Sequence, residues 1–169
     1  MSIAIAAFAG WNDAGSAATD AISFLAEQLE AEPVASINPE EYCDFQVNRP
    51  IVRLDSKGVR RIVWPATVFH QAFLPPDRDL FLISGVEPSF HWQAYMDEFM
   101  ENLADLGVDR LFLLGALLAD VPHTRPVNVQ VTASSPEFSE EVGGEESSYE
   151  GPTGIVGVLA AEALEHYQV

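Results

Sequence analysis

Four irregular loops carry the residues whose types could do chemistry. Asn12 and Asp13 lie in the turn Gly10-Trp11-Asn12-Asp13-Ala14-Gly15, which follows an apolar run. Asn and Asp side chains can cap the next helix, and the free amides at a helix start can bind an anionic group. The turn matches neither the dinucleotide-binding nor the phosphate-binding glycine pattern. Two interpretations are therefore open: a ligand loop, or a capped corner. In both we expect Trp11 to pack into the core.

The other loops add a carboxylate, an imidazole and a guanidinium. Glu87 follows Gly85 and precedes a proline, where it could bind a ligand hydroxyl or cap the next helix. Asp120, His123 and Arg125 share one loop that contains two prolines. The imidazole could move a proton and the guanidinium could bind a carboxylate or phosphate, or Asp120 and Arg125 could simply pair.

The hydrophobic pattern predicts strands and helices that alternate along the chain. The expected strands are 3–8, 34–37, 80–84, 110–114 and 127–133, and the expected helices are 14–31, the stretch after Ser89 up to Gly107, and the stretch from Pro152 onward. This alternation predicts an α/β domain, with a mostly parallel sheet between helical layers. In the helix after Ser89, the stripe of aromatic and Met side chains is expected to be core.

Ligands of such sheets bind beyond the carboxyl ends of the strands, so this rule gathers the four loops, 10–15, 85–89, 115–126 and 150–154, into one candidate cleft. The predicted cleft residues are Asn12, Asp13, Gly85, Glu87, Asp120, His123, Arg125 and Thr153. The chain has no Gly-x-Ser-x-Gly elbow, so serine hydrolase chemistry is disfavoured.

Residues 39–76 interrupt the alternation with a β-rich insertion. Short strands are expected at 42–45, 51–54 and 61–73, with a turn at 55–58. Five of the 8 basic residues fall here, on an otherwise acidic chain: Arg49, Arg53, Lys57, Arg60 and Arg61. A basic hairpin suits docking onto the acidic surface of a like subunit, although a merely solvated hairpin fits the pattern too. The predicted oligomer interface comprises Phe45, Arg49, Arg53, Arg60 and Trp64.

Composition limits the classes of function. The 169 residues, 48% of them hydrophobic, are enough for one domain, 1–169, with a real core. The formal charge of -18 disfavours nucleic acid and anionic membranes as partners. The first apolar run is too short for a membrane span and has no basic flank, so neither a signal peptide nor a membrane segment is expected.

Cysteine and histidine usage predicts a reduced setting without a metal. The single cysteine, Cys43, cannot form an intramolecular disulfide and is expected to be a buried structural residue, consistent with a cytoplasmic protein. His70, His91 and His166 are scattered, and no metal-ligand spacing occurs. No metal and no cofactor are therefore expected. The acidic segment 134–150 is expected to be mobile.

Six motifs, in chain order, together resemble one known family. They are Gly10 to Gly15, Asp44-Phe45-Gln46 with Arg49-Pro50, Trp64-Pro65, Gly85 to Pro88, Gly115 to Leu118 with Asp120 to Pro126, and Tyr149 to Gly154. The chain resembles the bacterial, actinobacterial-type branch of the proteasome assembly chaperone family, in the group named after the second eukaryotic assembly chaperone. Asp-Val-Pro-His-Thr-Arg-Pro and Glu-Gly-Pro-Thr-Gly are the specific segments.

The resemblance implies a three-layer α/β/α core similar to the purine nucleoside phosphorylase fold, a hairpin insertion used in oligomerisation, and a homotrimer. Eukaryotic and archaeal members assist the assembly of proteasome rings, whereas the bacterial branch has no established activity. Fold similarity to phosphorylases does not transfer catalysis. The family chain normally continues beyond the helix that starts at Pro152, so we expect this chain to lack the family's C-terminal part. Cys43 replaces an expected aromatic residue, which we interpret as neutral packing variation.

Three functional hypotheses follow. The first is a non-enzymatic assembly or scaffolding protein that works through oligomerisation and a protein partner. The second is a small-molecule binder, or a nucleoside phosphorylase-like or hydrolase-like enzyme, that uses the predicted cleft. The third is a regulatory protein that senses a ligand through the acidic segment 134–150. The first is favoured, because the cleft lacks a phosphate-binding cluster of basic residues beyond His123 and Arg125.

Overall fold

The computed structural model describes residues 1–76, 78–126, 129–143 and 149–166. The strands are β1 (Ile3–Ala9), β2 (Glu32–Ile37), β3 (Ile51–Leu54), β4 (Arg60–Val63), β5 (Thr67–Leu74), β6 (Arg78–Val86) and β7 (Arg110–Leu114). The helices are α1 (Ala17–Gln28), α2 (Trp92–Asp105), α3 (Pro136–Val142) and α4 (Ile155–His166), with short 3₁₀ turns at Ala14–Ser16 and Pro39–Glu41. Among the described helices, none is long and apolar enough to cross a membrane.

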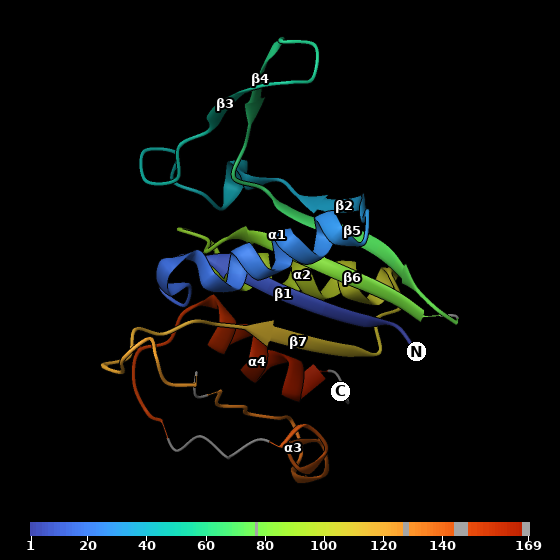
Figure 1. Cartoon of the computed structure of the whole chain (residues 1–169), viewed down its shortest axis with the longest axis vertical. Helices are drawn as coiled ribbons and strands as arrows, with labels where there is room; N and C mark the ends of the chain where they lie inside the picture. The colour runs from blue at the N-terminus through green and yellow to red at the C-terminus, as the bar shows by residue number, and fades with distance from the viewer. Residues whose placement is uncertain (77, 127–128, 144–148, 167–169) are drawn as a thin grey trace.

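Five strands form one sheet in the order β2-β5-β6-β1-β7, while β3 and β4 pair separately (Figure 1). β1 lies parallel to both β6 and β7, and β5 is antiparallel to both β6 and β2. Consequently β2, β6, β1 and β7 all run in the same direction, and β5 alone is reversed. The predicted mostly parallel sheet is confirmed, with β5 reversed because it returns from the inserted hairpin.

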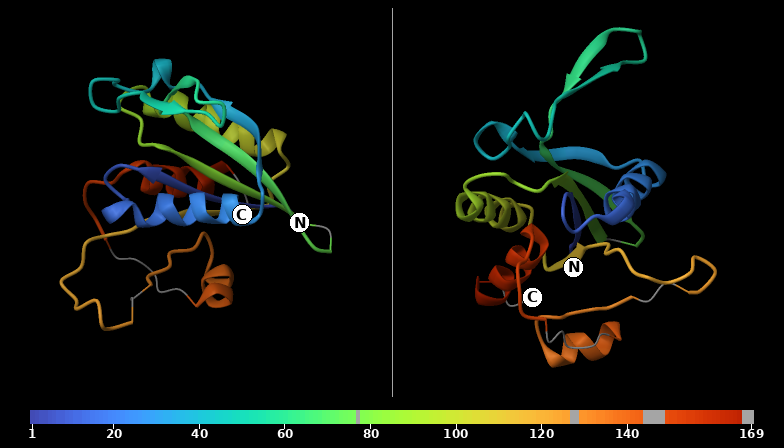
Figure 2. Two further views of the ribbon diagram at one scale, coloured as in Figure 1. Left: turned by 45° about the horizontal axis from the view of Figure 1, so that its top comes forward. Right: turned by 90° about the vertical axis from the view of Figure 1, so that its left-hand side faces the viewer.

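Helices cover both faces of the sheet, as Figure 2 shows. On β1, Ala4, Ala6 and Phe8 belong to the core cluster beneath α2 and α4, whereas Ala7 packs with residues of α1. A strand that is buried on both faces needs apolar side chains at every position, which explains the continuous apolar run in the sequence. The predicted three-layer α/β/α fold class is confirmed.

The centre of the larger core is aromatic. Phe99 of α2 is fully buried, and its ring centroid lies 5.7 Å from that of Phe8 and 5.5 Å from that of Phe69. Tyr95 of α2 is also buried, and its hydroxyl lies 2.6 Å from Oγ1 of buried Thr67. Burial raises the pKa of Tyr95 well above its ordinary value. The aromatic stripe of this helix is therefore core packing, as expected from the sequence.

The strand expected at 42–45 does not form. The amides of Tyr42 and Cys43 both donate to the carbonyl of Pro39, which continues the 3₁₀ turn. Asp44 then accepts a hydrogen bond from the Gln46 amide at 2.7 Å, and this side-chain bond folds the backbone into a turn. Cys43 is buried as expected, and burial raises the pKa of its thiol.

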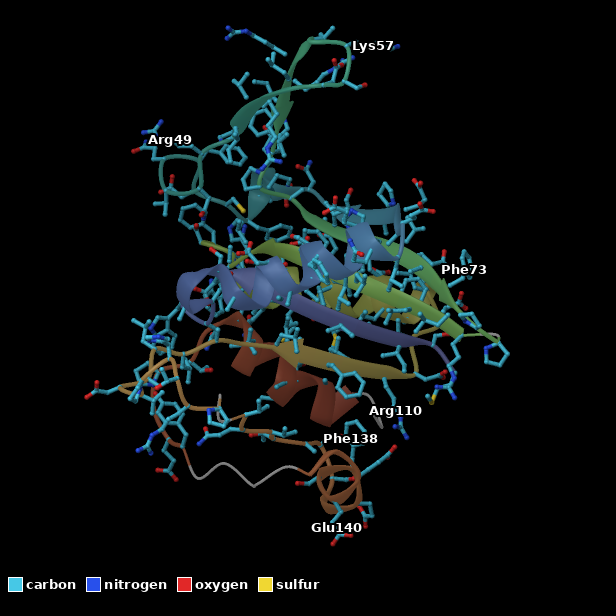
Figure 3. The ribbon with its side chains drawn as sticks, in the orientation of Figure 1. Arg49, Lys57, Phe73, Arg110, Phe138 and Glu140 are labelled. Atoms are coloured by element: carbon cyan, nitrogen blue, oxygen red, sulfur yellow. The ribbon has the colours of Figure 1, made fainter. Side chains whose placement is uncertain are left out.

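The prediction of a strand at 127–133 is wrong for the residues of that range that the structure describes. Residues 127–128 lie outside the described residues, and 129–133 form no strand. Helix α3 contacts β7 instead through a few side chains. The ring of Phe138 packs on Phe112, and the guanidinium of Arg110 lies over the Phe138 ring and pairs with Glu141 at 3.0 Å (Figure 3).

Helix α3 also belongs to the acidic segment expected to be mobile. Its start is capped by Ser135, whose side chain accepts from the Phe138 amide, and Gly143 ends the helix in a left-handed conformation. Residues 136–142 therefore form a regular helix. The expected mobile segment also includes 144–148, which lie outside the described residues.

Candidate functional site

Glu87 is the central residue where the parallel strands end. Its amide donates to the carbonyl of Ala9 at 2.8 Å, which extends the β1–β6 pairing by one bond. Its Oε1 accepts from the amide of Ile155, the first residue of α4, at 2.8 Å, and its Oε2 makes a longer 3.5 Å contact with the Trp11 amide. The positive end of a helix favours an anion, and here that anion is the carboxylate of Glu87.

Two glycines allow this close approach. A β-carbon at Gly154 would lie 2.1 Å from Oδ1 of Asn12 and 2.6 Å from Oε1 of Glu87. A β-carbon at Gly10 would lie 2.8 Å from Cβ of Glu87, and Gly10 has a φ of +149°, which favours glycine. Gly154 is a residue of this cluster that the predicted cleft residues do not include. The available signal was its place in the Gly-Pro-Thr-Gly motif, directly before a helix.

Asp13 caps helix α1. Its Oδ1 accepts from the Ala18 amide at 2.8 Å and from the Thr19 amide at 3.3 Å, and its Oδ2 accepts from the Thr19 hydroxyl. Asp13 is buried and also forms an isolated parallel bridge with Ala116. Every one of these contacts is internal, so the side chain of Asp13 acts on α1.

Asn12 is the member of the cluster with unused hydrogen-bonding capacity. Its backbone carbonyl accepts from the Ala116 amide at 2.7 Å, which ties the β1 turn to the segment after β7. Its Oδ1 is buried and has no hydrogen-bond partner within the described part of the chain. Because Oδ1 lies against Gly154 and Glu87, Asn12 is the side chain through which this cluster could receive a donor from outside.

The remaining predicted cleft residues do not join this cluster. Gly85 packs against buried Thr67, because a β-carbon there would lie 2.3 Å from the Thr67 hydroxyl oxygen. Asp120, His123 and Arg125 lie exposed in the loop after β7, and no hydrogen bond or ion pair within the described ranges links them to Asn12 or Glu87. Thr153 is exposed, and among the described residues its hydroxyl donates to the carbonyl of Gly154 at 3.5 Å and lies beside Gly157.

Trp11 is not in the core, so that expectation was wrong. Its side chain is 58% exposed. Phe8, three residues earlier, already occupies the buried end of β1 against Tyr95 and Phe99. The backbone beyond Gly10 then turns outward, and Trp11 is left on the surface at the strand ends.

Two pockets of the described residues lie away from this cluster. One small pocket lies between α2, β7 and α4, and is lined by Met100, Leu103, Val108 and Ala163 among others. A second lies at the β5–β6 turn. Among the described side chains, no group of three His, Cys, Asp or Glu residues could hold a metal ion.

The β3–β4 hairpin is the most exposed regular element. It projects from the sheet (Figure 1), and all eight residues of its two strands are exposed. Asp55 shapes the connecting turn by accepting from the amides of Lys57 and Val59, and it pairs with Arg61 at 3.2 Å. These bonds, led by that from the Val59 amide, lower the pKa of Asp55. The tip therefore has a defined shape although nothing covers the strands.

The base of the hairpin is anchored beside the strand ends. The carbonyl of Tyr42 accepts from the amides of Ser89 and Phe90, and the Ser89 hydroxyl accepts from the Asp44 amide at 3.0 Å. Phe45 and Trp64 contact each other across the base, with ring centroids 5.1 Å apart. These contacts begin at Ser89, two residues after Glu87. They fix the direction in which the hairpin projects.

Tyr42 also binds α2, because its hydroxyl donates to Glu98 at 2.6 Å. This hydrogen bond, together with burial, raises the pKa of Tyr42 to about 12. Glu98→Gln is expected to lower that pKa toward the ordinary value near 10, measured by absorbance at 295 nm during a pH titration. The folded state holds the hydroxyl proton of Tyr42 more tightly than the unfolded state does. The contribution of the protonated Tyr42 to stability is therefore present below pH ~10 and is lost as the pH rises through about 12. Tyr42→Phe identifies the step, and an unchanged titration in Glu98→Gln would contradict the assignment.

The match to one protein family includes both the strand-end cluster and the β3–β4 hairpin. The PAC2 family matches residues 7–167. The chain belongs to the PAC2 family. It is similar to the crystal structure of a PAC2 family protein from Streptomyces avermitilis, with 44% identity and a TM-score of 0.90 over 98% of this chain and 71% of that one. This confirms the family that the sequence motifs indicated.

Two further solved structures extend the comparison. A proteasome-assembly chaperone homologue from Mycobacterium tuberculosis is 45% identical, with a TM-score of 0.85 over 96% of this chain and 70% of that one. An archaeal proteasome activator from Pyrococcus furiosus is 14% identical, with a TM-score of 0.69 over 96% of this chain and 69% of that one, which shows a shared fold alone. No curated protein matches the chain significantly.

Proposed function

We propose that this PAC2 chain is an assembly or scaffolding protein that works by self-association, and that the β3–β4 hairpin is its contact surface. The exposure of both hairpin strands on both faces carries the proposal. An isolated two-stranded hairpin is marginally stable in water, so covering it with a partner would be favourable. Its side chains also suit an interface, since exposed aliphatic residues lie beside arginines on both strands.

The distribution of charge supports a second copy as the first partner. Residues 45–66 contain five basic residues and one acidic residue, whereas the rest of the chain contains three basic and 25 acidic residues. The hairpin of one copy would therefore be attracted to the body of another. A contact between two different surfaces of like subunits closes into a ring when the rotation allows it, and we expect a homotrimer.

The relatives supply the class of further partner. The Mycobacterium tuberculosis protein is named as a proteasome-assembly chaperone homologue and the Pyrococcus furiosus protein as a proteasome activator. By analogy, we infer that the client is a proteasome subunit or an assembly intermediate, in the cytoplasm. This role needs no catalytic group. At the strand ends, the carboxylate of Glu87 already occupies the anion-binding position at the start of α4.

The test is the molar mass of the protein in solution, measured by light scattering after size-exclusion chromatography. The wild-type chain is expected to elute as a multiple of 18.5 kDa. Ile51 and Val63 are an exposed cross-strand pair, and Ile51→Glu with Val63→Glu is expected to give a folded monomer. The matched control is Phe24→Glu with Val34→Glu, two exposed apolar residues outside the hairpin, which should leave the mass unchanged. A wild-type mass of one chain at every concentration, or a hairpin variant that still associates, would overturn the proposal.

A second candidate function is a small-molecule site at the strand ends, such as that of a nucleoside-processing enzyme, and it depends on Asn12. Its buried, unpartnered Oδ1 is the observation in favour. The carboxylate of Glu87 would repel a phosphate there, so a neutral hydrogen-bond donor fits better. A thermal-shift screen with nucleosides, inorganic phosphate and carboxylates tests this site. Stabilisation that Asn12→Ala abolishes would support it, and no shift with any probe would exclude it for these compounds.

A further inference from the structure

Helix α2 turns a face of carboxylates toward solvent. Asp97, Glu101 and Asp105 are all exposed and follow at four-residue intervals, with Ala94 and Ala104 exposed beside them. At 1.5 Å per residue, the three carboxylates span about 12 Å along the helix. None of the ion pairs between described residues involves this face.

This face is locally unfavourable for the isolated chain. Like charges four residues apart repel each other on a helix. Asp105 also lies in the last turn, where the helix dipole disfavours an anion, and that turn contains no basic residue. Cations supplied from outside the chain would therefore stabilise α2, and the small side chains of Ala94 and Ala104 leave room for a flat element to approach.

The hairpin carries cations over a matching length. Arg53 lies on β3 opposite Arg61, and Lys57 lies at the far tip, turned away from the sheet as Figure 3 shows. Four residues of extended chain span about 13 Å, and the turn at 55–58 makes the distance from Arg53 to Lys57 shorter than that, so these cations do not extend much beyond the row of α2 carboxylates. Arg53 and Arg61 share one face of the hairpin with the aliphatic pair Ile51 and Val63. That face therefore has both cations for the carboxylates and apolar side chains for the alanines.

A chain cannot make this contact with its own hairpin. The hairpin leaves the body at the strand ends and projects away from it, whereas α2 lies against the sheet (Figures 1 and 2). The only ion pair that the hairpin makes with a described residue is internal, between Arg61 and Asp55. We propose that the hairpin of one copy docks across the outer face of α2 of a second copy; this inference rests on the proposed function and names the receiving surface.

Helix α1 is the alternative acidic surface, and it fits less well. Its exposed acids, Asp20 and Glu27, are seven residues apart, and Phe24 projects between them with 61% of its surface exposed. A cationic hairpin would have to pack over that ring, and its cations would meet two carboxylates instead of three. The continuous acidic row of α2, with small residues beside it, favours α2 as the receiving helix.

Charge reversal on the full chain tests the pairing. Arg53→Glu with Lys57→Glu leaves the Asp55–Arg61 pair intact, and Glu101→Arg with Asp105→Arg changes the receiving face. Each pair of substitutions is expected to weaken self-association by about tenfold or more, and all four in one chain are expected to restore it. Asp20→Arg with Glu27→Arg on α1 is the control of equal charge change. Masses are measured from about 0.05 M to about 0.5 M NaCl, where screening should weaken the wild-type contact.

The outcomes separate this inference from the proposed function. If the hairpin reversal dissociates the protein but the α2 reversal does not, the hairpin still mediates assembly and α2 is not its receiver. If both reversals dissociate it and the combination does not restore it, the two surfaces do not face each other and the inference fails. If neither the hairpin reversal nor the aliphatic Ile51→Glu and Val63→Glu variant changes the mass, the proposed function itself fails. Circular dichroism of each variant confirms that it is folded.

Discussion

Phe99→Ala is expected to lower the free energy of unfolding by about 3–5 kcal/mol, with a fall in melting temperature of roughly 10 °C. Phe99 is fully buried and packs against the rings of Phe8, Phe69 and Tyr95, which belong to α2 and to two strands of the sheet. Alanine removes the buried ring and leaves a cavity that three rigid neighbours cannot collapse to fill. Urea unfolding followed by circular dichroism measures the change.

Phe73→Ala is the matched control, because the same side chain is 75% exposed at the end of β5. It should change the free energy of unfolding by no more than about 0.5 kcal/mol. Equal losses in the two variants would show that the aromatic cluster is not the centre of the core. The oligomer would add to the stability of the wild type, so both variants are compared at one protein concentration.

Glu87→Ala is expected to cost about 1.5–3 kcal/mol, because a charged acceptor is removed from the amide of Ile155 at the start of α4. The same substitution leaves space beside Gly10 and Gly154, whose lack of a side chain is matched to the Glu87 side chain. Glu87→Gln keeps an oxygen for the amide but loses the charge at the helix start, so a smaller loss, roughly 0.3–1 kcal/mol, is expected. Chemical denaturation gives the free energies, and hydrogen exchange of the Ile155 amide reports on the cap directly.

Glu27→Ala serves as the control for loss of one negative charge, since Glu27 is exposed on α1 and has no ion pair among the described residues. It should be neutral or slightly stabilising, because Glu27 lies in the last turn of α1, where the helix dipole disfavours an anion. A loss in Glu87→Ala no larger than in this control would contradict the capping role. A glutamate needed only for binding an outside ligand would give that result.

The layers of the fold could be predicted from the chain because periodicity reports burial. The apolar runs 3–8, 80–84 and 110–114 became β1, β6 and β7, and the helical stripe after Ser89 became α2. The errors lie where local hydrogen bonds compete with the pattern. Asp44 folds the backbone into a turn where apolar neighbours suggested a strand, and the edge of β7 is contacted by α3 where residues 127–133 were expected to form a strand.

The candidate site was predicted only in part. The rule that ligands bind at strand ends directed attention to Asn12, Asp13 and Glu87, and the structure places these residues at one edge because the register of the parallel strands brings their ends together. It could not separate these residues from Asp120, His123 and Arg125, which come from the same edge but lie in an exposed loop. Whether a loop folds back over a site depends on contacts that one sequence does not record.

By itself, the order of residues determined the family, the α/β layers and the segregation of charge between hairpin and body. These properties depend on local spacing and on counts of residue types, which need no long-range contact. Only the tertiary structure decided that Glu87 fills the start of α4, that Trp11 is exposed, and that α2 turns Asp97, Glu101 and Asp105 outward. The physical reason is that capping, exposure and unpaired charge depend on which distant segments come into contact, and a helix start 68 residues away along the chain is invisible to the pattern around Glu87.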